Sequence, residues 1–246
     1  YDAMDLMAAA LRLGIDVESL EFLIADFKDA FFIVPNRADE RRWFVVLFRG
    51  KYYIFLRTTQ GSRGAPLTWA RLAALITRLT QSVLDVTTSR INTYVDDPIV
   101  ALIGSRSERD TKCAMVLLLW SSLGLPLSLE KAVRGHSVTW TSAIFTPGAR
   151  CLWLEVKKAI IEDATECTDR FLRLNVVATK ELKSLTGKLA HVASIVPTLT
   201  PFLSELYAAL SNDNGSAPRG CIWMKQIAAP LKWVQAFLKG TPGQLK

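Results

Sequence analysis

Two adjacent carboxylates, Asp96 and Asp97, separate two short apolar segments that have the composition of β-strands. The segments Ile91–Val95 and Ile99–Ile103 are rich in β-branched residues, which favours an antiparallel pair. The acidic residues then fall at the tip of a β-hairpin. Pro98 removes one hydrogen-bond donor at the start of the second strand, which is tolerated at the edge of a sheet and puts the geometry of the tip in question.

The apolar periodicity elsewhere predicts an α+β protein. Helices are expected at Ala3–Leu13, Pro66–Leu84 and Asp110–Leu123, and strands at Glu21–Val34, Trp43–Phe48, Tyr52–Leu56, Ser137–Ile144 and Cys151–Val156. Further helices are expected at Lys158–Leu174, Thr179–Ile195, Pro201–Leu210 and Ile222–Leu238. We therefore predict an antiparallel sheet packed on helices in residues 1–156 and a helical domain in residues 157–246.

The charge of the chain favours a polyanionic partner. The chain has 246 residues, half of them hydrophobic, and a net charge of +7. The stretch from Lys180 to Lys246 holds eight Lys/Arg and three Asp/Glu, which fits a surface that binds nucleic acid. A basic surface without a nucleic-acid partner stays open as an alternative.

The cysteines indicate a reducing compartment. Four cysteines are far apart and form no C-x-x-C pair, and neither histidine lies at ligand spacing from them, so a zinc site is not expected. No signal peptide or membrane-spanning run is visible. We expect an intracellular protein, cytoplasmic or nuclear, without a membrane partner. Because the chain starts at Tyr1, a fragment of a longer protein is expected.

A third carboxylate follows another apolar segment. Asp26 comes directly after Phe22–Ala25, so a neighbouring strand could bring it to Asp96 and Asp97. Nucleotidyl transfer uses two divalent cations about 3.5–4 Å apart, and hard cations take oxygen ligands. Three carboxylates that repel one another without a cation are therefore typical of a Mg²⁺ or Mn²⁺ site; two solvated acids on a surface turn are the alternative for Asp96 and Asp97 alone.

A glycine-containing loop precedes the second predicted helix. It runs from Gln60 to Pro66, and Gly61 and Gly64 allow a ligand to approach the backbone closely. Pro66 suits the first turn of a helix. A plain junction between a loop and a helix is the alternative interpretation.

In this order the motifs resemble those of reverse transcriptases. Asp26–Pro35 is similar to their motif A, Gln60–Pro66 to motif B, and Tyr94–Asp97 to the Y-x-D-D of motif C. Leu123–Pro126 with Lys131 resembles motif D, and Glu181–Ala190 resembles the thumb helix of retroviral and retrotransposon enzymes. The resemblance covers roughly residues 20 to 210 and is closest to retrotransposons with long terminal repeats or of the DIRS-like kind. It implies a polymerase palm with a remnant of fingers, followed by a helical thumb.

The resemblance also assigns roles to residues. The metal ions would be held by Asp26, Phe27, Asp96 and Asp97, and Lys131 would protonate the pyrophosphate. Phe31 would exclude a 2′-hydroxyl. The incoming deoxynucleoside triphosphate would contact Phe27, Lys28, Asp29, Ala30, Phe31, Gln60 and Gly61. The template and primer would contact Lys183, Gly187 and Lys188. The alternative interpretations are a core aromatic for Phe31 and a solvated surface for the lysines.

Departures from the family pattern leave other functions open. Arg12 is the single basic residue before Asp26, so the basic fingers strands are largely absent. A missing N-terminal segment or a partner chain is expected to complete them, and the chain alone is expected to polymerise poorly. One alternative is a catalytically inactive fragment that binds nucleic acid or protein. The other is an RNA-dependent RNA polymerase, and Phe31 and the Y-x-D-D argue against this second alternative.

Overall fold

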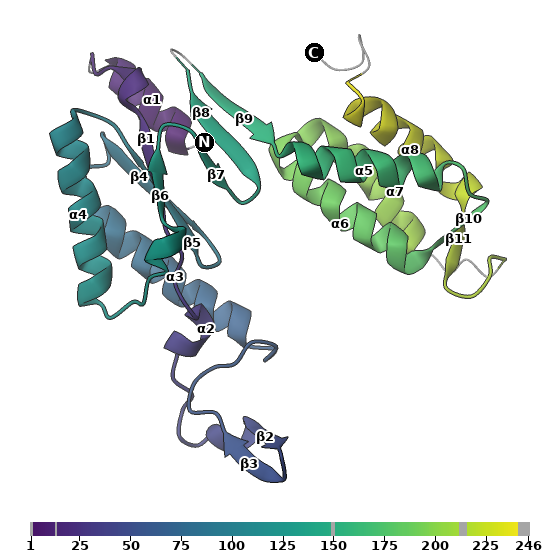
Figure 1. Ribbon diagram of the computed structural model, residues 1–246, viewed down its shortest axis with the longest axis horizontal. Helices are drawn as coiled ribbons and strands as arrows, with labels where there is room; N and C mark the ends of the chain where they lie inside the picture. Colours follow the sequence, from purple (N-terminus) through teal and green to yellow (C-terminus); the bar gives the residue numbers. More distant parts are fainter. Residues whose placement is uncertain (1, 13, 149–150, 212–215, 241–246) are drawn as a thin grey trace. The chain divides into compact units, whose positions relative to one another are not determined.

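The computed structural model describes residues 2–12, 14–148, 151–211 and 216–240. The chain divides into two compact units, Tyr1–Trp153 and Leu154–Lys246 (Figure 1). The mixed architecture of antiparallel sheets and helices confirms the predicted α+β class.

The first unit is built around a four-stranded antiparallel sheet in the order β4-β5-β1-β6. Its strands are β1 (Glu21–Ile24), β4 (Ser89–Tyr94), β5 (Asp97–Leu102) and β6 (Val133–Gly135). The register places Ile24 opposite Ile99 and Tyr94 opposite Asp97. The sheet therefore brings the end of β1 beside the start of β5, where the acidic residues lie.

Helices cover both faces of this sheet (Figure 1). Alternate residues of a strand point to opposite faces, so Leu23 and Val100 pack with α3 and α4, whereas Phe22 and Ala101 pack with α1. The helices are α1 (Asp2–Arg12), α3 (Ala65–Ser82) and α4 (Arg106–Ser122). The predicted helix at Ala3–Leu13 matches α1, although Leu13 lies outside the described residues. Burial on both faces explains why β1 and β5 are apolar without alternation.

Pro98 lies in β5, an interior strand of the sheet, and not at the edge where a proline is tolerated most easily. Its carbonyl accepts a hydrogen bond from the Ala25 N–H at 3.2 Å, so its backbone faces β1. Proline has no N–H to donate in return, so this pair keeps a single hydrogen bond, and the next one runs from the Phe27 N–H to the Asp96 carbonyl. Asp26 lies between Ala25 and Phe27, which both donate hydrogen bonds to the segment from Asp96 to Pro98.

Two smaller strand groups accompany the main sheet, and the last strand of the second group, Leu152–Val156, runs across the boundary between Trp153 and Leu154. The short helix α2 (Ala30–Ile33) leads to a hairpin of β2 (Val45–Phe48) and β3 (Lys51–Ile54), as predicted. A second sheet has the order β7-β8-β9, with β7 (Val138–Trp140), β8 (Ala143–Pro147) and β9 (Leu152–Val156). The single strand predicted at Ser137–Ile144 was wrong, because Thr141 and Ser142 both take positive φ and turn the chain back.

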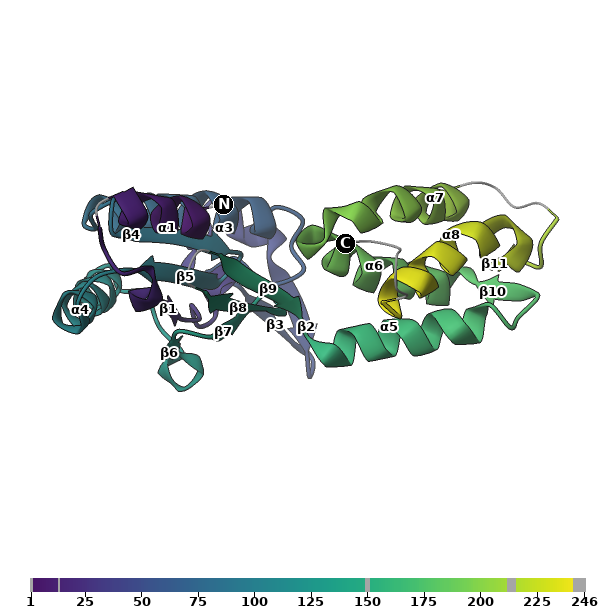
Figure 2. The same cartoon turned by 90° about the horizontal axis from the view of Figure 1, so that it is seen from above.

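The second unit is mainly helical. It contains α5 (Lys158–Phe171), α6 (Thr179–Ile195), α7 (Thr200–Ser211) and α8 (Met224–Leu238), packed with each other around one core (Figure 2). A two-stranded sheet of β10 (Val176–Ala178) and β11 (Cys221–Trp223) joins two of the connections. The helix predicted from Ile222 therefore begins at Met224, because the preceding residues pair with β10.

Candidate active site

Asp26 is held at its position by its buried neighbour Phe27. The Phe27 ring packs edge-on against Trp69 and Trp120, with centroids 6.0 and 5.2 Å away. The Phe27 N–H donates to the Asp96 carbonyl at 2.9 Å. Because successive side chains of an extended chain point in opposite directions, burying Phe27 directs Asp26 away from this core.

The turn that carries Asp96 is fixed by hydrogen bonds from two tryptophans. Trp69 Nε1 donates to the Val95 carbonyl at 2.7 Å, and Trp140 Nε1 donates to the Asp97 carbonyl at 2.9 Å. Val95 has φ of 56°, a conformation that a β-branched residue rarely adopts. Backbone strain of this kind is characteristic of functional sites, and here the surrounding tryptophans maintain it.

The three carboxylates interact electrostatically. Burial raises the pKa of Asp97, and the negative charges of Asp96 and Asp26 and a hydrogen bond with Asp26 raise it further. Burial also acts to raise the pKa of Asp26, but hydrogen bonds from Ser128 and Lys131 and the charge of Lys131 outweigh it and lower that pKa. Asp97 is therefore the carboxyl that most resists ionisation, as expected where like charges crowd together.

Lys131 is the cation in contact with this cluster. Its Nζ lies 3.0 Å from Asp26 Oδ2, and the side chain is 63% exposed. The hydrogen bond and the charge of Asp26 raise the pKa of Lys131. The ammonium group thus neutralises Asp26 and leaves the repulsion between Asp96 and Asp97.

The donor set suits a hard divalent cation, because all three side chains offer carboxylate oxygens. In the part of the chain that the structure describes, however, no group of three or more His, Cys, Asp or Glu side chains is close enough to hold a metal ion. The three side chains therefore carry the oxygen donors that a metal site needs. In this structure the donors are not arranged so that they could bind one ion together.

Phe31 borders a cavity of about 590 Å³ beside the strained turn. The other walls come from α3, through Trp69 and Ala73, and from the hairpin, through Thr93 and Val95. The lining does not include Asp26. Phe31 and the turn that carries Asp96 thus face one apolar space.

The other residues predicted to bind the nucleotide differ in accessibility. The side chains of Phe27 and Ala30 are buried in the core, so they can offer only their main-chain atoms. Lys28 and Asp29 line a different cavity, together with Phe32 and Pro126. Asp29 has a left-handed backbone with φ of 52° and starts α2.

Gln60 and Gly61 lie in the exposed loop before α3. Gly61 has φ of 85°, which glycine adopts without strain. Pro66 lies in the first turn of α3, as predicted. Within the described residues, Gln60 makes no hydrogen bond. The contact of Gln60 with the nucleotide stays a prediction.

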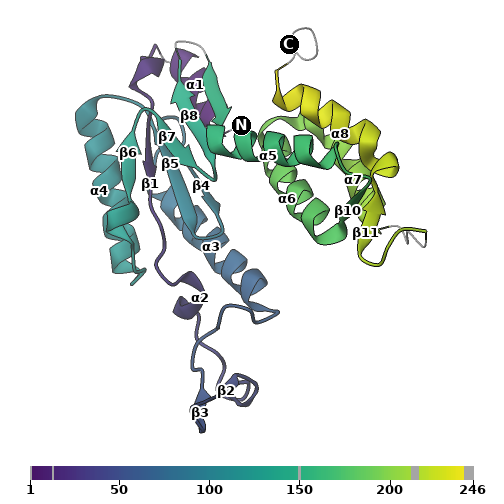
Figure 3. The ribbon, with the colours of Figure 1, turned by 45° about the vertical axis from the view of Figure 1, so that its right-hand side comes forward.

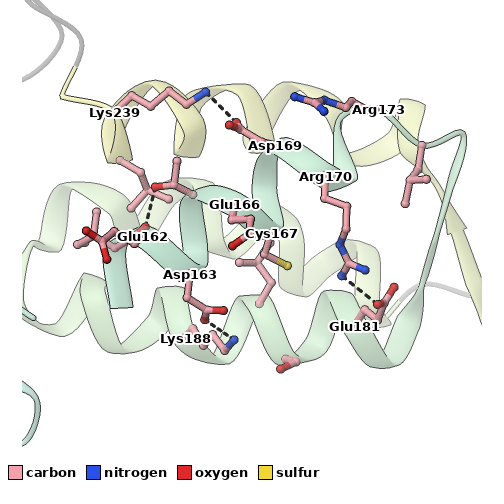
Figure 4. Close-up of a pocket in the computed structure, with 16 residues that line it drawn as sticks. Glu162, Asp163, Glu166, Cys167, Asp169, Arg170, Arg173, Glu181, Lys188 and Lys239 are labelled. Carbon is pink, nitrogen blue, oxygen red and sulfur yellow. Dashed lines mark hydrogen bonds and ion pairs between the residues drawn. The ribbon is translucent and has the colours of Figure 1, made fainter. Parts of the chain in front are cut away.

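The second unit holds the residues predicted to contact nucleic acid. Lys183 and Gly187 are exposed on α6. Lys188 forms an ion pair with Asp163 of α5, inside a groove of about 1180 Å³ between these helices (Figure 4). Lys188 is thus already neutralised, whereas Lys183 projects its charge into solvent.

Ser128, Trp69 and Trp140 support the site and were missed in the sequence. Ser128 binds Asp26 through its backbone N–H, at 3.0 Å from the Asp26 carbonyl, and through its side chain. Trp69 follows Pro66 by three residues, a spacing that places both near the start of the same helix. The sequence shows no signal for Ser128 or Trp140, because their partners are distant along the chain.

Among the described residues, no helix is both long enough and apolar enough to cross a bilayer.

Comparison with known proteins identifies similar structures. Two structures of a foamy viral protease–reverse transcriptase, one in complex with an RNA/DNA hybrid and one with double-stranded DNA, match with TM-scores of 0.61 and 0.60. They are 18% and 20% identical to this chain and align with 89% and 93% of it. The chain spans 27% and 37% of their lengths, respectively. At this identity the likeness concerns the fold.

Curated proteins give no match to this chain. The family model described as reverse transcriptase (RNA-dependent DNA polymerase) matches residues 14–159. That range contains Asp26, Asp96 and Asp97 and covers more than half of the chain. The chain therefore belongs to the reverse transcriptase family.

Proposed function

We propose that this chain is the palm and thumb of an RNA-directed DNA polymerase that extends a primer on an RNA or DNA template. In this proposal residues 1–156 form the palm with a remnant of the fingers, and residues 157–246 form the thumb. The observation that carries it is the placement of Asp26 beside the Asp96–Asp97 turn, through the hydrogen bond from Phe27 to Asp96. The motifs further favour an origin in a retrotransposon of the long-terminal-repeat or DIRS-like kind.

The carboxylates of Asp26, Asp96 and Asp97, with the main chain of Phe27, would hold Mg²⁺ or Mn²⁺. Such ions would activate the primer 3′-hydroxyl and neutralise the triphosphate of a deoxynucleotide. The raised pKa of Asp97 supports this assignment, since a bound cation would relieve the repulsion that raises it. Lys131 is protonated at neutral pH and so carries a proton that the departing pyrophosphate could take.

The test is single-nucleotide incorporation by residues 1–246 on a primed RNA template with Mg²⁺ or Mn²⁺. The segment before Asp26 offers one basic residue, Arg12, to align the triphosphate, so we expect slow incorporation. Asp96→Asn should abolish it, because removing preorganised charge typically lowers such rates by about 10²–10³-fold or more. Asp39→Asn, an exposed acid paired with Arg37, is the matched control and should retain the rate. Incorporation that survives Asp96→Asn would contradict the proposal.

Phe31 gives a second test of the same site, through the choice of sugar. If its ring excludes a 2′-hydroxyl, Phe31→Val should raise the incorporation of ribonucleotides relative to deoxynucleotides by about tenfold or more. A tenfold change corresponds to a difference of about 1.4 kcal/mol in activation free energy between the two sugars. Phe32→Val is the control, because Phe32 lines the other cavity. Equal selectivity in wild type and Phe31→Val would remove Phe31 from this role.

A non-catalytic nucleic-acid-binding module is the second candidate function. It is favoured by the absence, within the described residues, of a group that is close enough to hold a metal, and by the pairing of Asp26 with Lys131. Thermal unfolding with and without Mg²⁺ separates the two candidates. A polymerase site should gain stability from Mg²⁺ through Asp96 and Asp97, and a binding module should not.

A further inference from the structure

Three consecutive carbonyl groups at the β4–β5 turn accept hydrogen bonds from three different parts of the first unit. The donors and acceptors are Trp69 Nε1 with Val95 at 2.7 Å, the Phe27 N–H with Asp96 at 2.9 Å, and Trp140 Nε1 with Asp97 at 2.9 Å. Trp69 belongs to α3, Phe27 follows β1, and Trp140 ends β7. The backbone of the turn is therefore held by groups that are distant along the chain.

Val95 is the strained residue of this turn. Of Val95, Asp96 and Asp97, only Val95 has a positive φ, 56°. This conformation is unfavourable for a β-branched side chain and costs glycine nothing. Such strain persists only where the surroundings oppose its release. The bond from Trp69 acts on the carbonyl of Val95 itself, so it is the contact that opposes release most directly.

Trp69 is fixed in place by the core around it. Its side chain is 1% exposed, and its ring packs edge-on against Phe27 at 6.0 Å. Figure 3 shows α3, which carries Trp69, beside the β4–β5 hairpin. The indole offers one N–H donor and no acceptor. A phenylalanine at position 69 would keep an aromatic ring in this core and lose the donor, so the two contributions can be separated.

We propose that the indole N–H of Trp69 is a positioning group for Asp96 and Asp97. It holds Val95 in the left-handed conformation, and without it the turn relaxes and displaces the two carboxylates. Trp69 thus acts through the backbone of the turn and not as a catalytic residue. Its control of the turn stands on the geometry alone, whereas the consequence for nucleotide addition rests on the proposed function.

Trp120 provides a matched control. It is fully buried in the same hydrophobic cluster, and its ring packs edge-on against the same Phe27 ring at 5.2 Å. Its Nε1 donates to Thr80 Oγ1 at 2.8 Å and not to the turn. Trp120→Phe therefore removes the same atoms and one buried hydrogen bond from this core, and it leaves the three carbonyls with their donors.

Val95→Gly separates positioning from plain stabilisation. When the N–H is lost beside Val95, the turn relaxes, which recovers the strain and displaces the carboxylates. When it is lost beside glycine, there is no strain to recover, and the donors of Phe27 and Trp140 keep the turn in place. Trp69→Phe should therefore cost less stability and more activity with valine at position 95 than with glycine. A contact that only stabilises the fold would lower both together.

The first measurement is thermal unfolding of residues 1–246 without metal or nucleotide, for the wild type, Trp69→Phe, Val95→Gly and the double variant. Trp69→Phe should lower the Tm by about 2 °C or more beyond its effect in the valine background when residue 95 is glycine. Trp120→Phe should lower the Tm equally in both backgrounds. An equal or larger loss from Trp69→Phe with valine at position 95 would overturn the proposal.

The second measurement is single-nucleotide incorporation on the primed RNA template. Trp69→Phe should lower kcat by about 10- to 100-fold, the usual effect of a small displacement of reacting groups. The KM for the nucleotide should change by less than about twofold, because the lost interaction does not bind the nucleotide. In the Val95→Gly background the same substitution should lower kcat by less than about threefold, and so should Trp120→Phe in the wild type.

Equal losses of kcat from Trp69→Phe in the two backgrounds, or equal losses from Trp69→Phe and Trp120→Phe, would overturn the positioning role. A wild-type chain that incorporates no nucleotide would contradict the proposed function. The unfolding measurements would then still decide whether Trp69 controls the turn, because they need neither metal nor substrate.

Discussion

Asp97 lies in a half-buried position between two other carboxylates and is the residue whose ionisation most opposes folding in the site. Because burial and the charges of Asp96 and Asp26 raise its folded-state pKa, the folded chain holds this proton more tightly than the unfolded chain does. Ionisation of Asp97 therefore lowers the free energy of unfolding. Stored repulsion of this kind is common where a protein keeps groups for function rather than for stability.

We predict that Asp97→Asn stabilises the fold at pH 7. Solvent screening keeps the gain below about 1 kcal/mol, which corresponds to a rise in Tm of at most about 2–4 °C. The gain should be full above the raised pKa of Asp97 and vanish as the pH falls below about 3.9, where the carboxyl is protonated in both states. Thermal unfolding of both proteins across this range checks the sign. A variant that is less stable than the wild type at pH 7 would contradict it.

The carboxylates were found from sequence because each follows a strand-forming segment, and that pattern is local. The contacts that hold them were not, because they join distant positions. Trp140 lies 43 residues from Asp97, and Lys131 lies 105 residues from Asp26. The assignment of Lys131 came from the resemblance to motif D, and the structure brings its Nζ to Asp26.

At the scale of elements, two of the three lysines of α6 lie in different environments. Lys183 is exposed, whereas Lys188 is paired with Asp163, and nearby Arg170 is paired with Glu181 (Figure 4). In the first pair α5 supplies the acid and α6 the base, and in the second pair α5 supplies the base and α6 the acid. Phosphate contacts from both Lys183 and Lys188 were predicted, and the ion pair places Lys188 in a different environment from Lys183.

We predict that Lys183→Ala lowers the log–log salt dependence of duplex binding by about 0.7–0.9, the amount for one phosphate contact. Lys188→Ala should lower it less, because phosphate must compete with Asp163 for that ammonium group. Asp163→Asn should make the effect of Lys188→Ala approach that of Lys183→Ala. The affinities are measured by anisotropy at several salt concentrations. An unchanged slope in the Lys183→Ala/Lys188→Ala double variant would show that α6 does not bind the phosphates.

Helices were the elements predicted best, since their period is long enough to read from sequence, and the predicted Thr179–Ile195 has the same bounds as α6. Short strands were predicted less well. The turn between β7 and β8 uses Thr141 and Ser142 in left-handed conformations, without the glycine or asparagine that signals such a turn. The strand β11 was assigned to a helix because its pairing with β10 depends on a partner far along the chain.

At the scale of the whole molecule, each unit has its own hydrophobic core. The core of the second unit combines Leu185 and Leu189 of α6 with Leu206 of α7 and Leu231 of α8, all buried. The first unit has two clusters, one on each face of its main sheet. The change from strands to helices near residue 156 was visible in sequence. The order of the strands within each sheet could not be predicted from the sequence, because strand order depends on contacts between distant segments.

We predict that residues 154–246 fold when expressed alone, because their core is built from side chains of that segment. Far-UV circular dichroism should show helices that melt in one cooperative transition. Leu185→Ala should destabilise this unit by about 2–5 kcal/mol, the usual effect of truncating a buried leucine. Its Tm should then fall by on the order of 10 °C or more.

Leu174→Ala, at an exposed position, is the matched control and should shift the Tm little. Leu185→Met preserves volume and should stay folded with a loss below about 1.5 kcal/mol. A gradual transition without cooperativity in the wild-type segment would show that its core needs the first unit.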